Sequence, residues 1–261
     1  METSNLPPEE LPAVASPPSL GSCLANVFAA PGEVFERLRP APARTATWLL
    51  PAVLLILVSW IGSAIVLSQA SIKQQLSDMQ EKGIQQQVDK GKLTEDQAKQ
   101  IREVTERYGN IGIVIAAYAG PVFVAALTPF WWGLLLWLIG AKLLRGTCTY
   151  LKAVEVAGLT NLIGVLGAVL KTLLVLVTGN LFAGANPALL IPNFDPNVTW
   201  QSALLNLDLV TFWVLAVRGL GIAKVSGVST GKAVGLTFGI WFAVTGLIVG
   251  GAFALKALLG R

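Results

Sequence analysis

The sequence contains no histidine and unusually few charged residues. Charged side chains account for 13% of its 261 residues, whereas hydrophobic side chains account for 54%. A soluble globular chain usually has about a quarter of its residues charged. Because the apolar residues gather in long runs, the composition predicts an integral membrane protein with an all-α fold, a polytopic bundle of transmembrane helices.

The absences also limit the chemistry. Histidine is the commonest general base and metal ligand, and Cys23 and Cys148 are too far apart in sequence to indicate a CxxC motif or a disulfide framework. No catalytic triad, metal-ligand spacing or haem motif is present, and "GVSTGKAVG" lacks the pattern of a phosphate-binding loop. No block of basic residues resembles a nucleic-acid arm. We therefore expect no enzymatic activity, no catalytic residue, no metal, no cofactor and no nucleic-acid partner.

The N-terminal region divides into two parts. Residues 1–19 are Pro-rich and acidic, which predicts a disordered tail, and they lack the basic start of a secretory signal. Residues 20–46 form an expected interfacial amphipathic segment, in which Val34, Phe35 and Leu38 share one apolar face. That face is expected to lie either in the headgroup boundary or against the protein's own spans, and the pattern leaves both open.

The membrane domain is expected over residues 47–255. Its five apolar runs are long enough to cross roughly 30 Å of hydrocarbon. The expected spans are about 48–67, 111–141, 154–178, 204–223 and 233–255. The second contains Pro121 and Pro129, which predict kinks. Three tryptophans near its end, Trp131, Trp132 and Trp137, fit either an interfacial belt or helix packing.

A polar insert separates the first two spans. Residues 68–110 carry seven basic and seven acidic residues, typical of a solvated helical hairpin outside the bilayer. Thr94 and Gln97 have the spacing of a capping box at the start of its second helix. The region between the third and fourth spans is Pro-rich with one charge, Asp195, and is expected to be a partly inserted, irregular loop.

The basic residues predict the orientation of the spans. The short loops after the second and fourth spans carry five basic residues, and the loop after the third carries none. Because basic loops stay in the cytoplasm, we expect a cytoplasmic N-terminus and an outside C-terminus.

Four ionisable residues fall within the spans: Glu155, Lys171, Asp208 and Arg218. A charge within the bilayer costs at least a few kcal/mol, so each should have a partner or a wet path. Their depths predict two interhelical pairs, Glu155–Arg218 and Lys171–Asp208. The alternatives are that Lys171 and Arg218 extend to the nearest interface, or that these charges form a substrate or proton route.

The fifth span carries a stripe of small residues at steps of three or four. Its members are Gly235, Gly239, Ala243, Gly246, Gly250 and Ala254. Such a stripe allows a second helix to approach closely. The partner helix is expected either within the chain or in a second copy of it.

Three segments have the order of features of one known family. They are "VFAAPGEVFERLRP" with "TWLLP", "GTCTYLKAVEVAGLTNLIGVLG", and "LDLVTFWVLAVRGLGIAKVSGVSTGKAVG". The matching positions are Tyr150, Ala153, Gly158, Asp208, Trp213, Gly219 or Gly221, Ser229, Lys232 and Ala233. Over about residues 24–255 the chain resembles the Yip family, the Rab/Ypt-interacting multi-span membrane proteins, and its bacterial branch in particular.

The tail departs from the eukaryotic members, which carry a longer acidic or aromatic region held to engage Rab GTPases. Rab-type GTPase binding is therefore not carried over. The features together predict a non-enzymatic protein that organises or scaffolds the membrane. Its expected partners are the lipid bilayer and either another membrane protein or a homo-oligomeric copy. The alternative is a small transporter or channel with Lys171 and Asp208 in a polar path.

Overall fold

The computed structural model describes residues 18–108, 111–191, 194–196 and 198–259. Over these residues the chain is helical and contains no strand, which confirms the all-α prediction. The predicted disordered tail, residues 1–19, lies outside the described residues except for Pro18 and Ser19.

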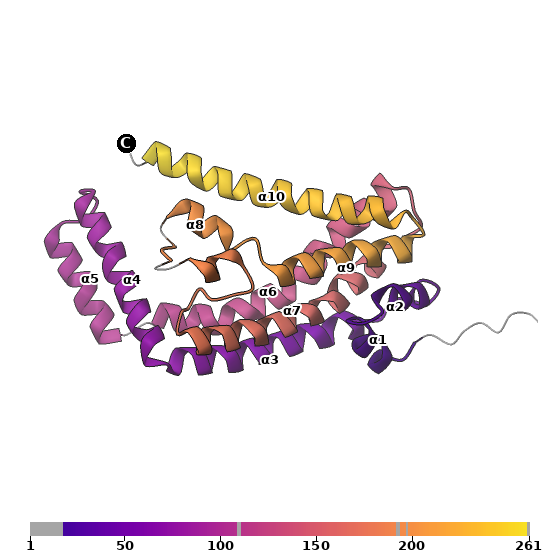
Figure 1. The fold of residues 1–261 in the computed structure, drawn as a ribbon, viewed down its shortest axis with the longest axis horizontal. Helices are drawn as coiled ribbons and strands as arrows, with labels where there is room; N and C mark the ends of the chain where they lie inside the picture. Colours follow the sequence, from indigo (N-terminus) through magenta and orange to yellow (C-terminus); the bar gives the residue numbers. More distant parts are fainter. Residues whose placement is uncertain (1–17, 109–110, 192–193, 197, 260–261) are drawn as a thin grey trace, which may run out of the picture.

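Five of the described helices are long and apolar enough to cross a membrane, so the chain is a multi-pass integral membrane protein. They are α3 (Ala46–Ser68), α6 (Ile111–Trp137) with its π-helical continuation η1 (Leu138–Leu143), α7 (Tyr150–Thr178), α9 (Leu209–Ser226) and α10 (Thr230–Leu259). They run along the length of the molecule (Figure 1), and their number confirms the five-span prediction.

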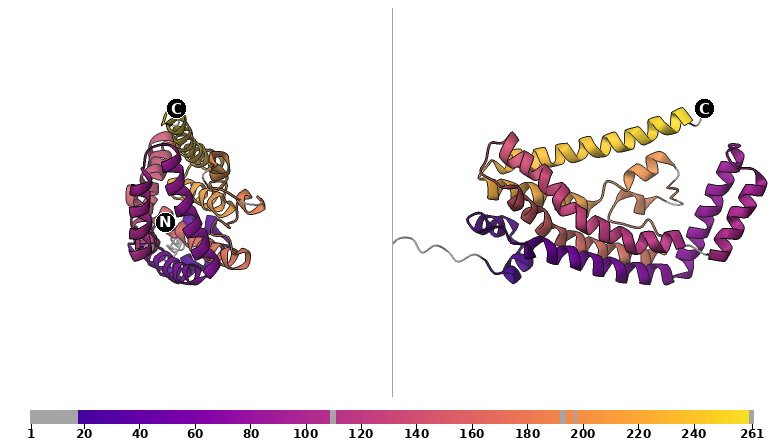
Figure 2. Two further views of the ribbon diagram at one scale, coloured as in Figure 1. Left: turned by 90° about the vertical axis from the view of Figure 1, so that its left-hand side faces the viewer. Right: turned by 180° about the vertical axis from the view of Figure 1, so that it is seen from behind.

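The short and polar helices lie at the two ends of this bundle. Helices α1 (Leu20–Asn26) and α2 (Pro31–Leu38) lie at one end, which we call the α1–α2 end. The hairpin of α4 (Ala70–Asp89) and α5 (Glu95–Tyr108) lies at the other, the hairpin end. Helix α10 also finishes toward the hairpin end, as the right-hand view of Figure 2 shows.

Polar caps and glycines set the boundaries of α7 and α9. Thr149 Oγ1 accepts a hydrogen bond from the backbone N–H of Lys152 at the start of α7, and Asp208 Oδ1 accepts one from Thr211 at the start of α9. Both helices end at glycines with left-handed backbone, Gly179 (φ 65°) and Gly227 (φ 69°). Because Asp208 caps α9, the fourth span begins at residue 209 instead of the expected 204.

The chain between α7 and α9 is irregular, as expected. It contains a 3₁₀ turn, η2 (Pro187–Leu190), and the short helix α8 (Thr199–Leu204). Figure 1 shows this segment folded back alongside α7 instead of projecting beyond it. It therefore forms one wall of the bundle beside α7 and α9.

The main hydrophobic core lies at the α1–α2 end. Helix α7 is buried without interruption from Lys152 to Ile163, where α3, α6 and α9 pack against it. The apolar faces of α1 and α2 also belong to this core, and Phe35 is fully buried against Gly221 of α9. The apolar face of this amphipathic segment therefore packs on the protein's own spans, which was one of its two expected positions.

Glycines allow the closest approaches between helices. The glycines of the fifth span's stripe are not among them. A Cβ atom on Gly158 would overlap Trp48 of α3, and one on Gly219 would lie 2.6 Å from Val234 Cα. By contrast, a Cβ atom on Gly235, Gly239, Gly246 or Gly250 would meet nothing within 4 Å. Within the described part of the chain, the stripe is thus not covered by another helix.

Side chains of α3 bond to the backbone of α6 one turn before Pro121. Proline has no N–H to donate to the carbonyl of Ala117 one turn earlier, and Ser63 Oγ donates to that oxygen at 3.3 Å. Trp60 Nε1 donates to the next carbonyl, that of Tyr118, at 2.8 Å. These bonds satisfy backbone acceptors that lipid would leave without a partner.

The polar hairpin is held by capping and one exposed ion pair. Thr94 and Gln97 form the predicted capping box, with reciprocal bonds of 2.9 and 3.2 Å. Arg102 of α5 pairs with Glu81 of α4 at 2.7 Å. The hydrogen bond from Arg102 lowers the pKa of the Glu81 carboxyl below its ordinary value.

Candidate functional site

Glu155 lies in a buried polar cluster at the α1–α2 end. Its Oε2 pairs with Lys152 Nζ at 2.5 Å, and both side chains are nearly inaccessible. Its Oε1 accepts a hydrogen bond from Thr47 Oγ1 at 3.1 Å and a longer one from the backbone N–H of Arg44. The cluster joins α3 to α7 and leaves Glu155 fully partnered, which indicates a structural role.

Arg218 lies near the middle of α9 and is surrounded by neutral partners. Its Nε donates to Thr160 Oγ1 at 3.2 Å, and its Nη2 donates to Asn161 Oδ1 at 2.9 Å. The guanidinium lies over the ring of Trp132, 4.4 Å from the centroid. Only 5% of the residue is exposed.

The predicted Glu155–Arg218 ion pair is not formed. Arg218 bonds to α7 at Thr160 and Asn161, five and six residues after Glu155, which is about 8 to 9 Å further along the helix axis. Lys152, one turn before Glu155 on the same helix, pairs with it instead. The prediction placed Lys152 in a loop, because it started the third span at residue 154 and not at Tyr150.

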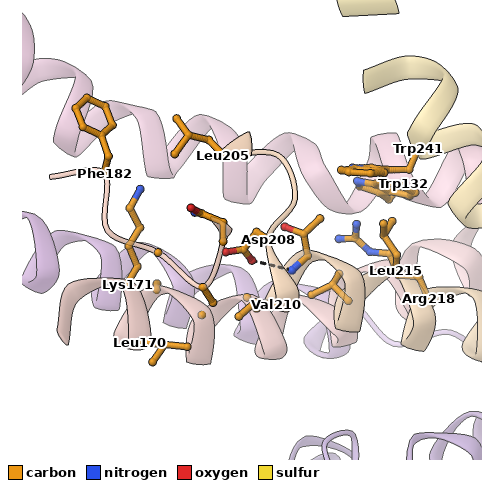
Figure 3. Close-up of a pocket in the computed structure, with 18 residues that line it drawn as sticks. Trp132, Leu170, Lys171, Phe182, Leu205, Asp208, Val210, Leu215, Arg218 and Trp241 are labelled. Carbon is orange, nitrogen blue, oxygen red and sulfur yellow. Dashed lines mark hydrogen bonds between the residues drawn. The ribbon is translucent and has the colours of Figure 1, made fainter. Parts of the chain in front are cut away.

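Arg218 closes one end of a cavity of about 540 Å³ between α7, α9 and the irregular segment. Figure 3 shows its guanidinium directed into the cavity beneath Trp132. The walls are mainly small or apolar. They include Gly164, Gly167, Ala168, Leu170, Val210, Val214, Leu215 and Trp241.

Lys171 and Asp208 line the same cavity, but they do not pair. Figure 3 shows Lys171 at the end opposite Arg218, with Asp208 between them. The carboxylate of Asp208 caps α9, and no ion pair joins it to Lys171 within the described chain. The predicted Lys171–Asp208 contact is therefore replaced by a shared cavity.

A second cavity of about 410 Å³ lies on the other side of Lys171, between α3, α6 and α7. Its walls are small and mainly apolar. They include Ser59, Gly62, Ser63, Ala116, Ala117 and Val175. Ala168 and Lys171 line both cavities, so Lys171 lies between them.

The sequence interpretation missed four residues that shape the Arg218 end: Trp132, Thr160, Asn161 and Trp241. Thr160 and Asn161 were a detectable signal, since adjacent polar residues inside an apolar run need partners. Of the three clustered tryptophans, Trp132 packs on Arg218, Trp137 lies under Lys142, and Trp131 is exposed. Trp132 therefore has the helix-packing role considered for the cluster.

The geometry offers little to metal or thiol chemistry. Among the described residues, no three side chains of His, Cys, Asp or Glu are grouped to hold a metal ion. Burial raises the pKa of the Cys23 and Cys148 thiols. Because the thiolate is the nucleophile, this shift lowers the reactivity of both thiols.

Comparison with known families agrees with the order of these elements. The model of the Yip1 domain matches residues 25–252. The chain belongs to the Yip1 family. The match covers α2, the first four spans, α10 as far as residue 252 and every residue of the Arg218 cavity. No curated protein and no solved structure matches the chain.

Proposed function

We propose that this Yip1-family protein is non-enzymatic and organises the bilayer around it by acting as a wedge. The Yip1 domain is not a known enzyme family. The arrangement of the spans, and not a reactive centre, is therefore the starting point. The bacterial inner membrane and a cytoplasmic N-terminus are part of the same proposal.

The position of α10 is the observation that carries the proposal. Helix α10 packs mainly on α9 and η1, with the closest approach at Gly219 and Val234 near the α1–α2 end. Figures 1 and 2 show it diverging from α6 and α7 toward the hairpin end. A body that occupies more area in one leaflet than in the other separates lipids unequally, and this favours curvature.

Reconstitution of the full chain into liposomes tests the wedge. We expect vesicle diameters, measured by electron cryomicroscopy, to fall as the protein-to-lipid ratio rises. Protein-free liposomes taken through the same detergent removal are the control. Diameters that stay the same at every ratio would contradict a membrane-shaping role.

A small transporter is the second candidate, because Lys171 and Asp208 face a common cavity. The packing beyond Arg218 argues against a continuous path. Between the cavity and the α1–α2 end lie the fully buried side chains of Leu136, Ile139 and Ile222. A cavity closed in this way supports binding better than passage.

Cysteine accessibility separates the two candidates. In a variant with Cys23 and Cys148 replaced by alanine, Thr211→Cys places a thiol in the cavity and Ala223→Cys places one in the packed core. For an organiser we expect a membrane-impermeant maleimide to label Thr211→Cys from one side only, and Ala223→Cys from neither. Labelling of Thr211→Cys from each side in turn would favour transport.

A further inference from the structure

Among the described residues, no acidic side chain pairs with the charge on Arg218. Its partners, Thr160, Asn161 and Trp132, are all neutral. The two acidic residues predicted within the spans, Glu155 and Asp208, both have other partners. Glu155 pairs with Lys152, and Asp208 caps α9 ten residues before Arg218, or about 15 Å along the helix.

A cation in this position is costly. Arg218 is eight residues from the end of α9 and nine from its start, so about 12 to 14 Å of helix separates it from either end. Neutral hydrogen bonds and a tryptophan face solvate the guanidinium but do not neutralise it. A buried charge without an opposite charge is destabilising, and the binding of an anion would remove that cost.

A second buried donor lies beside the guanidinium. Asn161 uses its Oδ1 to accept from Arg218, and its Nδ2 is buried with no partner. Arg218 has five N–H donors, of which those on Nη1 bond to no described residue. Arg218 lines the cavity, and Asn161, which bonds to it, is buried beside it. Their unused donors suit an acceptor with negative charge.

We infer that Arg218 and Asn161 bind the oxyanion, a carboxylate or a phosphate ester, of a membrane amphiphile whose apolar body lies in the cavity. The walls of the cavity favour an amphiphile over a free ion. Val210, Val214 and Leu215 are apolar, and a small ion would leave them in contact with water. The volume of about 540 Å³ is within the range of small-molecule sites. This site does not depend on the wedge proposal, since a binding cavity is compatible with a protein that leaves bilayer shape unchanged.

Binding of defined amphiphiles to the full chain in neutral detergent tests the site. The probes are oleate, dioleoyl phosphatidic acid, zwitterionic dioleoyl phosphatidylcholine and inorganic phosphate, with adducts measured by native mass spectrometry. We expect oleate or phosphatidic acid to bind, and phosphatidylcholine to bind more weakly. Because hydrogen bonds to a charged group are strong, Arg218→Gln should weaken binding by about ten- to a hundred-fold.

Two further variants make the test independent of folding. Asn161→Asp places a carboxylate where Oδ1 already accepts from Arg218, so it supplies the missing charge within the protein. This variant should unfold no more easily than the wild type and should lose anion binding. Lys142→Gln is the matched control, because Lys142 also lies over a tryptophan ring, 5.1 Å from Trp137, but is exposed outside the cavity.

Binding of the probes to the wild type and the variants decides whether the site exists. Loss of oleate or phosphatidic acid binding in Asn161→Asp but not in Lys142→Gln supports the site, and the preferred probe identifies carboxylate or phosphate. Competition by inorganic phosphate at the same concentration as the amphiphile would overturn the apolar part of the inference. Equal binding in wild type, Arg218→Gln and Asn161→Asp, or binding of no probe to any of them, would overturn the site.

Discussion

The two halves of the bundle place similar residues in opposite situations. At the α1–α2 end, Lys152 and Glu155 are buried and paired, and glycines bring helix backbones into contact. Toward the hairpin end, Lys171 and Asp208 line a cavity without pairing, and the glycines of α10 face open space. Charges and small residues therefore stabilise the first half, whereas in the second half they leave room for lipid or a ligand.

The largest effect is expected from removing the buried acid. Glu155→Gln leaves Lys152 buried without an opposite charge, and breaking such a pair costs about 3 to 5 kcal/mol. Lys171→Gln, in the open half, should change the free energy of unfolding by less than about 0.5 kcal/mol. Unfolding by SDS in mixed micelles measures both, and equal losses would remove the distinction between the halves.

The next largest difference in stability is expected between alanine substitutions of a packed glycine and of an open one. Gly158→Ala forces a Cβ atom into Trp48, and overpacking of this kind costs about 1 to 3 kcal/mol. Gly239→Ala meets no neighbour and should leave stability unchanged or raise it by up to about 1 kcal/mol through helix propensity. The same SDS titration compares them. A loss of stability in Gly239→Ala would indicate that the stripe packs against a second copy.

A smaller loss of stability is expected where Ser63 of α3 bonds to the backbone of α6 one turn before Pro121. Ser63→Ala removes the bond to the carbonyl of Ala117, and such bonds in membranes average about 0.6 kcal/mol. Ser59→Ala is the matched control, since Ser59 lines the same second cavity and its hydroxyl bonds to no other described residue. If both variants unfold at the same SDS fraction, Ser63 does not compensate Pro121.

The smallest effect concerns the pH dependence of the hairpin. The hydrogen bond from Arg102 lowers the pKa of Glu81 in the folded state, so the unfolded hairpin binds the proton more readily. The contribution is present above the ordinary pKa of 4.5 and is lost as the pH falls through the lower, folded value. Amide exchange in α4 and α5 should therefore accelerate below pH 4.5 more in the wild type than in Arg102→Gln. Identical pH profiles would contradict the pairing.

The lengths of the helices were largely predictable, whereas their partners were not. Long apolar runs and caps such as Thr94 with Gln97 depend on neighbouring residues alone, so they locate helices without knowledge of the fold. The errors arose at boundaries. Starting the third span at residue 154 excluded Lys152, and with it the true partner of Glu155.

The small-residue stripe illustrates the same limit. The spacing of Gly239, Gly246 and their neighbours identifies a helix face that another helix is able to approach. It carries no information on whether one does, because that depends on where the remaining spans find better contacts. In the described chain those contacts form at Gly158 and Gly219 instead.

The amino-acid sequence alone determined that five helices are long and apolar enough to cross the membrane, that a charged hairpin interrupts them and that Glu155, Lys171 and Arg218 lie within the spans, because each follows from local hydropathy and periodicity. Only the tertiary structure decided that Arg218 meets Thr160, Asn161 and Trp132 and not a carboxylate. That set comes from α6, α7 and α9, and the rotation and offset of three helices depend on packing throughout the bundle.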